Sequence, residues 1–267
     1  MQLHIRHETQ YSYSEPVKRS VQSLRLTPRQ EAAQHTLSWT ISAPGRQYAQ
    51  QDAHGNIVHL LTIDQPHRNI HLVVHGVVET DEAHCTLLHE PGTLAPLTYL
   101  AATSLTRPDA ALETFANKFK SKDRDLQTNL LGLANAVCEH IEYERGVTDV
   151  RESAAEAFAR RKGVCQDHAH VFLACARCIG VPARYVSGYY NTGKRNEVTS
   201  HAWVDVWLGP DSGWLGIDVT HRFLVNGQHC RLAVGRDYLE ACPVRGVRRG
   251  GGREAMEVAV TISAAQQ

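Results

Sequence analysis

The spacing of hydrophobic residues changes after about residue 81, and this change limits the folds open to the chain. Up to that point, short runs alternate apolar and polar residues, as in residues 3–7. Turn residues such as Pro44 and Gly45 separate the runs, a pattern typical of a small β-sandwich or barrel. Residues 81–99 are irregular, and apolar residues at helical spacing follow. A chain of 267 residues is therefore expected to contain two compact units or one large one.

The second part of the chain mixes helices with strands. Ser153 and Glu156 form a capping-box pattern before a short helix, and Gly180 ends a longer one. The predicted elements are helices near residues 126–141, 153–159 and 164–179, and strands over residues 183–190, 201–208, 214–219 and 254–262. The fold class is thus α+β: an N-terminal β-sandwich-like domain over 1–81, an α+β core with an antiparallel sheet over 97–247, and a C-terminal loop and strand over 248–267.

Composition excludes several classes of protein. The 28 basic and 28 acidic residues cancel, so the strong basic surplus of a nucleic-acid binder is missing. The mean hydropathy is −0.34, and no apolar run approaches the roughly 18 residues of a membrane span. The N-terminus has no apolar leader pattern, which predicts a cytoplasmic protein without nucleic-acid or membrane partners. Seven cysteines, an odd number, favour free thiols over a disulfide framework.

Cys165 occupies an unusual position for a cysteine. It follows Gly163 and Val164 directly and begins the predicted helix over 164–179. A thiolate at a helix N-terminus faces free N–H groups and the positive end of the helix dipole, which favours the charged form. The alternative is a buried, inert cysteine, and position alone does not decide between the two.

Two strands after that helix bring a histidine and an aspartate together. In residues 201–208 the even positions are apolar, so His201 and Trp203 share the opposite face. In residues 214–219, Asp218 lies opposite the apolar positions. If both apolar faces pack on one core, pairing joins odd with even positions. One such register places His201 opposite Asp218, and the next places Trp203 there with His201 diagonal to Asp218.

A cysteine at a helix start beside a His–Asp pair is a nucleophilic constellation. Cys165 would attack, His201 would activate the thiol and protonate the leaving group, and Asp218 would orient the imidazole. The backbone N–H of Cys165 is a candidate oxyanion donor.

Three sequence blocks resemble those of a known family. They are Gly163-Val-Cys165-Gln-Asp-His, Ser200-His201-Ala-Trp-Val-Asp and Gly213-Trp-Leu-Gly-Ile-Asp218. In order and separation they are similar to the catalytic blocks of the transglutaminase-like superfamily. The segments at 231–238 and 244–247, with the glycines at 250–252, resemble its bacterial subfamily, which carries an N-terminal β domain before the core.

This resemblance implies a papain-like core over 97–247 and thiol acyl chemistry on an amide, with Cys165, His201 and Asp218 as catalytic residues. Two positions depart from the pattern of the family. The position of His168 is usually occupied by an aromatic residue, and the segment Thr220-His221 also differs. The main prediction is a cysteine peptidase or amidase acting on a peptide or protein substrate through an acyl-enzyme. Transfer of the acyl group to an amine, as in a transglutaminase proper, and a non-catalytic binding module with a vestigial triad remain alternatives.

Other candidate residues carry weaker signals. Tyr143, Asp167 and Trp203 are candidates for the substrate site, and the loop over 191–199 is expected to set specificity. Cys175 and Cys178, with histidines nearby, allow a zinc site as a third alternative. Both cysteines lie on an apolar helix face, so core packing is favoured and no metal is expected. No phosphate-binding glycine loop or calcium-loop pattern is present, so no cofactor is expected.

Overall fold

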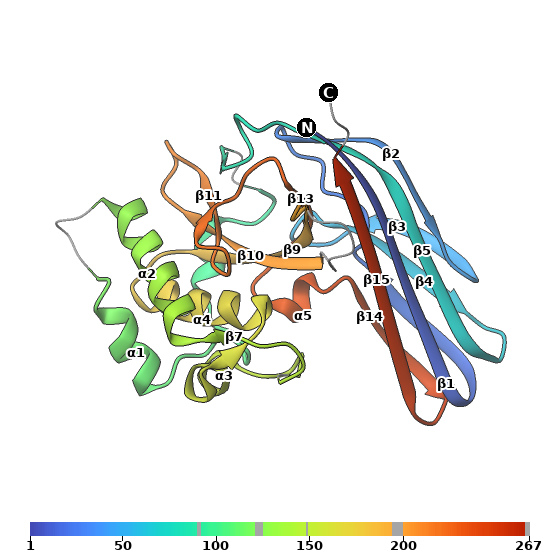
Figure 1. Ribbon diagram of the computed structural model, residues 1–267. Coiled ribbons are helices and arrows are strands. Elements are labelled where there is room, and N and C mark those ends of the chain that lie inside the picture. The colour runs from blue at the N-terminus through green and yellow to red at the C-terminus, as the bar shows by residue number, and fades with distance from the viewer. Residues whose placement is uncertain (90–91, 121–124, 148, 194–199, 265–267) are drawn as a thin grey trace.

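The protein is built on two antiparallel sheets, one of which carries the helices. The computed structural model describes residues 1–89, 92–120, 125–147, 149–193 and 200–264. Figure 1 shows the larger sheet on one side of the molecule, and the smaller sheet with the helices on the other. The expected α+β class is confirmed. In the described part, no helix is long and apolar enough to span a bilayer.

The larger sheet contains seven strands. Five come from the N-terminal region: β1 (Gln2–Leu24), β2 (Gln34–Ser42), β3 (Arg46–Gln51), β4 (Ile57–Ile63) and β5 (His67–Thr80). Leu3 and Ile5 are buried, whereas the residues that follow each of them, His4 and Arg6, are exposed, so alternation along β1 gives the sheet one inner face. The pairing of β1 shifts register between Ser12 and Val17, so its two halves meet different partners.

The other two strands of this sheet come from the far end of the chain. β14 (Val244–Gly250) pairs with the second half of β1, and β15 (Glu254–Ala264) pairs with the first half. The sequence placed residues 248–253 in a loop. The structure instead extends β14 to Gly250, because pairing with β1 satisfies the backbone of this segment. The turn narrows to the three glycines at 250–252, all with positive φ, which only glycine adopts at little cost.

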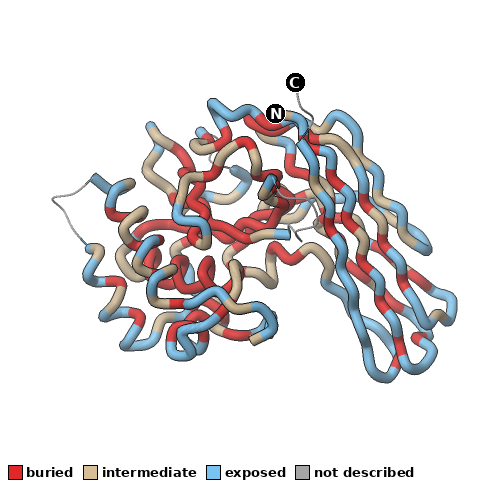
Figure 2. The backbone as a smooth tube through the Cα atoms, in the orientation of Figure 1, coloured by how far each residue is buried: buried red, intermediate tan, exposed pale blue. Residues whose placement is uncertain are grey.

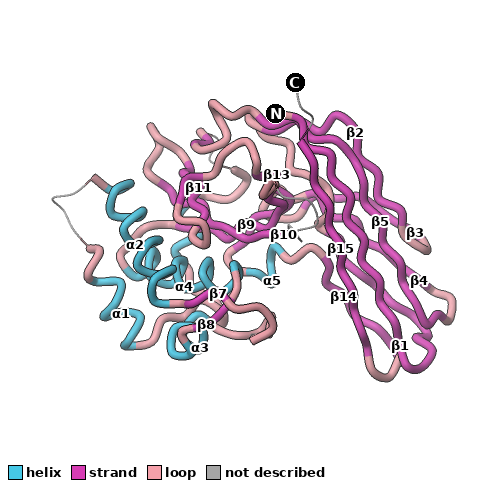
Figure 3. The backbone as a smooth tube through the Cα atoms, viewed as in Figure 1, coloured by secondary structure: helices cyan, strands magenta, loops and turns pink. Residues whose placement is uncertain are grey.

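The smaller sheet and the helices beside it form the second unit. Its strands are β6 (Leu87–Leu88), β9 (Ala183–Tyr190), β10 (Ser200–Trp207), β11 (Trp214–Asp218), β12 (Phe223–Leu224) and β13 (His229–Gly235). The helices are η1 (Pro96–Leu100), α1 (Ala110–Asn117), α2 (Leu126–His140), α3 (Ala154–Arg160), α4 (Cys165–Cys178) and α5 (Tyr238–Ala241). A two-strand parallel ladder joins β7 (Glu142–Tyr143) to β8 (Lys162–Gly163) just before α4. Figure 3 shows the helices gathered beside the smaller sheet, with the short strands β7 and β8 among them.

Helix α4 lies at the centre of the second unit. It packs against α1, α2, α3 and the strands β9 and β10. The sequence predicts one apolar face for it, but every residue from 166 to 177 is buried. In Figure 2, continuous buried stretches run through the region of α4 and the smaller sheet, whereas buried and exposed residues alternate along the larger sheet. The start of α4 is therefore held by the whole core of this unit.

The two units share a hydrophobic core. Tyr189 of β9 and Leu232 of β13 belong to the same buried cluster as Leu3 and Ile5 of β1. The larger sheet thus packs directly on the smaller one, and its inner face lies beside the start of α4.

Candidate active site

The start of α4 presents Cys165 as the first residue of the helix. Val164 precedes it in an extended conformation, and its backbone N–H donates to Oδ2 of Asp167 at 2.7 Å. A side chain at Gly163 would place a Cβ 2.7 Å from the Asp167 Cβ, closer than two carbons can lie. Glycine is therefore required for the chain to enter α4 at this angle. Asp167 was expected from the sequence to contact the substrate. In the structure it is 1% exposed and instead stabilises the start of α4.

The strands β10 and β11 pair in the second of the two registers expected. Val204 pairs with Ile217, and Trp207 pairs with Trp214. This register places Trp203 across from Asp218 and leaves His201 on the diagonal. His201 Nε2 donates to Asp218 Oδ2 at 2.8 Å, so the two side chains meet as the pattern predicted.

His201 also forms a hydrogen bond with Cys165. Because Nε2 is directed at Asp218, Nδ1 is the ring nitrogen left to exchange a proton with the thiol. Burial opposes the charged imidazolium, but the hydrogen bonds to Asp218 and Cys165 outweigh it and raise the pKa of His201 to about 10. The imidazole is therefore protonated at neutral pH, the form that stabilises a thiolate.

Two further histidines bind the same carboxylate oxygen. His221 Nδ1 lies 2.8 Å from Asp218 Oδ2, and His229 Nε2 lies 3.1 Å from it. A carboxylate oxygen only accepts, so Nε2 of His229 carries a proton and donates it to Asp218, while Nδ1 lies against Asn226. Burial raises the pKa of Asp218, but the hydrogen bonds from the three histidines hold it well below its usual range.

Neither of these roles was predicted from the sequence. His221 follows Asp218 by three residues, and the turn there also brings its backbone N–H to Asp218 Oδ1. That spacing of three residues is a local signal for a contact between the two side chains. His229 begins β13, a strand that the sequence analysis did not predict. No local pattern connects it with Asp218.

Cys165 and His201 line a cavity of about 280 Å³ between the two sheets. Its walls combine the start of α4 with residues of β9 and β10. The N-terminal strand β1 and the C-terminal strand β15 form the opposite side. The nucleophile candidate is half-buried and reachable from this cavity.

The structure places Tyr143 and Trp203 apart from this cavity's lining. Trp203 is fully buried, with its ring 5.1 Å from that of His229. Tyr143 is 46% exposed and pairs with Gly163 in the parallel ladder before α4. Of the loop expected to set specificity, residues 194–199 lie outside the described residues.

The residues of the zinc alternative do not converge on a metal site. Cys175 is fully buried in the hydrophobic core, where burial raises the pKa of its thiol. His168 bonds Thr220 Oγ1 and the carbonyl of Ile141, and His170 accepts from a backbone N–H. Within the described residues, the group spaced to hold a metal is His201, Asp218 and His221, whose ligand atoms lie within 4.8 Å of one another. Both histidines already donate a hydrogen bond to Asp218 Oδ2.

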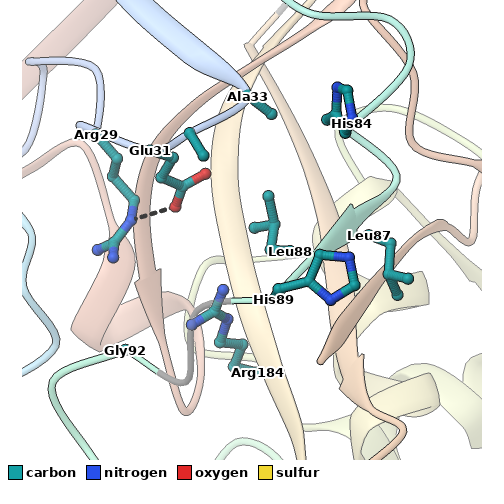
Figure 4. Close-up of a pocket in the computed structure, with 10 residues that line it drawn as sticks. Arg29, Glu31, Ala33, His84, Leu87, Leu88, His89, Gly92 and Arg184 are labelled. Carbon is teal, nitrogen blue, oxygen red and sulfur yellow. Dashed lines mark hydrogen bonds and ion pairs between the residues drawn. The ribbon is translucent and has the colours of Figure 1, made fainter. Parts of the chain in front are cut away.

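A second cavity, of about 320 Å³, lies away from Cys165. Figure 4 shows Arg29 on one side of it and His84 and Leu87 on the other. Arg184 also borders it and is bound to Asp205 at 2.9 Å. The residues that line it include neither Cys165 nor His201.

Comparison with known proteins agrees with this architecture. The family model of the transglutaminase-like superfamily matches residues 113–219. That of the bacterial transglutaminase-like N-terminal region matches residues 3–79. An uncharacterized protein of Mycobacterium leprae is 31% identical over 280 residues, which cover 96% of each chain. One of Mycobacterium tuberculosis is 31% identical over 271 residues, 91% of this chain and 86% of the relative.

A solved structure shares the whole fold. A protein of Cytophaga hutchinsonii, described as a candidate cysteine protease, superposes with a TM-score of 0.80 at 20% identity. The match covers 100% of this chain and 91% of that one. The chain therefore belongs to the transglutaminase-like superfamily, in the group that carries the bacterial N-terminal region.

Proposed function

We propose that this protein is a cysteine-dependent amidase that hydrolyses a peptide or isopeptide bond through an acyl-enzyme. The observation that carries the proposal is the hydrogen-bonded series Cys165–His201–Asp218, open to a cavity at the start of α4. The thiol acyl chemistry general to the superfamily supports the same assignment.

The proposed reaction has two steps. The Cys165 thiolate attacks the amide carbonyl, and the carbon–nitrogen bond breaks as His201 gives its proton to the departing amine. In the second step His201 takes a proton from water, and the resulting hydroxide displaces Cys165 from the thioester. Asp218 holds the His201 ring in place and stabilises its positive charge. The backbone N–H of Cys165, in the first turn of α4, would stabilise the oxyanion.

The first experiment compares the wild type with Cys165→Ala. Alkylation of the wild type by iodoacetamide should be fastest at Cys165, as mass spectrometry would show. The variant should lose all amidase activity on a peptide-amide library while its circular dichroism and unfolding midpoint stay unchanged. Activity that survives in Cys165→Ala would rule out the proposal, as would equal labelling of all seven cysteines.

The same experiment separates hydrolase from transferase. Mass spectrometry of the products, with a labelled primary amine present, distinguishes carboxylate from amide. Water should be the main acceptor. Predominant amine incorporation would instead identify an acyltransferase. A binding module would show neither product, and Cys165→Ser would then behave as the wild type in cells.

A further inference from the structure

The larger sheet forms one wall of the cavity around Cys165. Thr9 and Tyr11 of β1 line it, together with Met256 and Val258 of β15. Thr9 pairs with Val258 and Tyr11 with Met256, so the four side chains are cross-strand neighbours on one face. They form one continuous patch opposite the candidate nucleophile, and we call it the β1–β15 wall.

The exposure of this wall changes along β15. Val260, which lies on the same face, is 4% exposed. Val258 is 37% exposed and Met256 is 56% exposed. The exposed fraction of the apolar side chains on this face of β15 therefore rises where the strand borders the cavity. Exposed apolar residues that border a site with a nucleophile are typical of a ligand-binding surface.

The described lining of the cavity carries no formal charge outside the Cys165–His201 pair. It contains no Asp, Glu, Lys or Arg among the described residues. His7 also lines it, and burial lowers the pKa of His7 to about 4, so its ring is neutral at pH 7. A charged side chain that enters this cavity loses hydration and meets no ionic partner beyond the Cys165–His201 pair, and such a loss costs several kcal/mol in an apolar site.

The size of the cavity limits what it can hold. About 280 Å³ lies just below the ~300–1,000 Å³ usual for pockets that bind drug-sized molecules. The cavity therefore suits individual side chains next to a scissile bond better than a large ligand.

We propose that the β1–β15 wall selects the substrate by accepting an uncharged, apolar side chain on the acyl side of the scissile amide. The inference rests on the proposed function, because it assumes that Cys165 attacks the bond beside this side chain. It assigns the larger sheet a direct part in substrate recognition.

The test uses peptidyl chloromethyl ketones that alkylate Cys165. Acetyl-Leu, acetyl-Asp and acetyl-Lys chloromethyl ketones are compared by the rate of Cys165 labelling, each normalised to its rate with glutathione. The leucine reagent should label the wild type at least tenfold faster than either charged reagent. Val258→Asp and Met256→Asp should lose this preference. In both variants the lysine reagent should label Cys165 faster than it does in the wild type. Val258→Lys should favour the aspartate reagent.

Ala255→Asp is the matched control. Ala255 is exposed on the same strand, but alternation directs its side chain to the other face of β15. This variant should keep the preference of the wild type. Equal rates for the three reagents, or a preference that Val258→Asp leaves unchanged, would overturn the inference. Because iodoacetamide tests Cys165 separately in the same proteins, failure of the proposed function would appear as slow labelling by that reagent as well.

Discussion

At the scale of single residues, Asp218 organises the site. Its side chain is fully buried, and such a charge is stable only when hydrogen bonds replace its lost hydration. Three imidazoles supply them at 2.8, 2.8 and 3.1 Å. The side chain of His221 is 36% exposed and that of His201 is 8% exposed, whereas that of His229 is fully buried. The buried His229 therefore holds the Asp218 carboxylate from within the core, while His201 bonds both Asp218 and the Cys165 thiol.

The first residue-scale prediction concerns Asp218→Asn. Asparagine keeps the shape but removes the charge that raises the pKa of His201 to about 10, so burial then lowers this pKa. The high-pH limb of the kcat/KM profile should move from near pH 10 to lower pH. Activity at pH 7 should fall by roughly 10²–10⁴-fold. Asp211→Asn, in the exposed loop between β10 and β11, is the control. An unmoved high-pH limb would contradict the assigned role of Asp218.

At the scale of elements, the entry into α4 determines where the thiol lies. The β7–β8 ladder pairs Tyr143 with Gly163, and the Asp167 carboxylate accepts the Val164 N–H. Both constraints act within three residues of Cys165. The orientation of the thiol thus depends on a glycine and a carboxylate that would not themselves touch the substrate.

Gly163→Ala tests this dependence. The added methyl would lie 2.7 Å from Asp167, so the helix start must shift. We expect a loss of about 1–3 kcal/mol in the free energy of unfolding and roughly 10²-fold in activity. Gly132→Ala in α2 is the matched control, because its methyl would meet Phe119 at 3.8 Å, an ordinary contact. It should gain about 0.5–1 kcal/mol. Urea unfolding and amidase rates measure both, and full activity in Gly163→Ala would argue against a fixed helix start.

At the scale of the whole molecule, a buried charge network joins the two units. Arg184 and Arg231 of the smaller sheet both bind Asp205 Oδ2, at 2.9 and 2.7 Å. Arg231 also lies 3.5 Å from Glu31, in the segment after β1. These side chains are at most 7% exposed. Together with the shared hydrophobic core, the network couples the stability of the larger sheet to that of the smaller one.

Asp205→Asn should therefore destabilise the whole molecule. Two buried guanidinium groups would lose their shared partner, which typically costs 3–5 kcal/mol. Urea unfolding followed by tryptophan fluorescence and by circular dichroism should give coincident transitions, shifted together. Asp64→Asn is the control, because the ion pairs of Asp64 with Arg19 and Arg46 are exposed and should matter far less. Two separate transitions in the wild type would show that the units unfold independently.

The local sequence patterns predicted the core of the site for a physical reason. Side chains alternate with a period of two along a strand, so His201 and Asp218 each lie opposite the apolar face of their own strand, and packing both apolar faces on one core brings the two side chains to the same face. The capping pattern at Ser153 likewise depends on neighbouring residues, and the structure contains that capping box. Cys165 was identified from its place at a helix start, which is also a local property.

The tertiary structure decided what depends on distant residues. The sequence left two registers for β10 and β11, and the turn through residues 208–213 selects one. His229 reaches Asp218 only because β13 pairs with β9. Residues 254–264 pair with residues 3–13, at opposite ends of the chain, and so build the wall that faces Cys165. Alternation of apolar and polar residues predicts which face of a strand a side chain occupies, but it does not predict which other strand pairs with it. Pairing between the two ends of the chain therefore depends on the packing of the whole molecule.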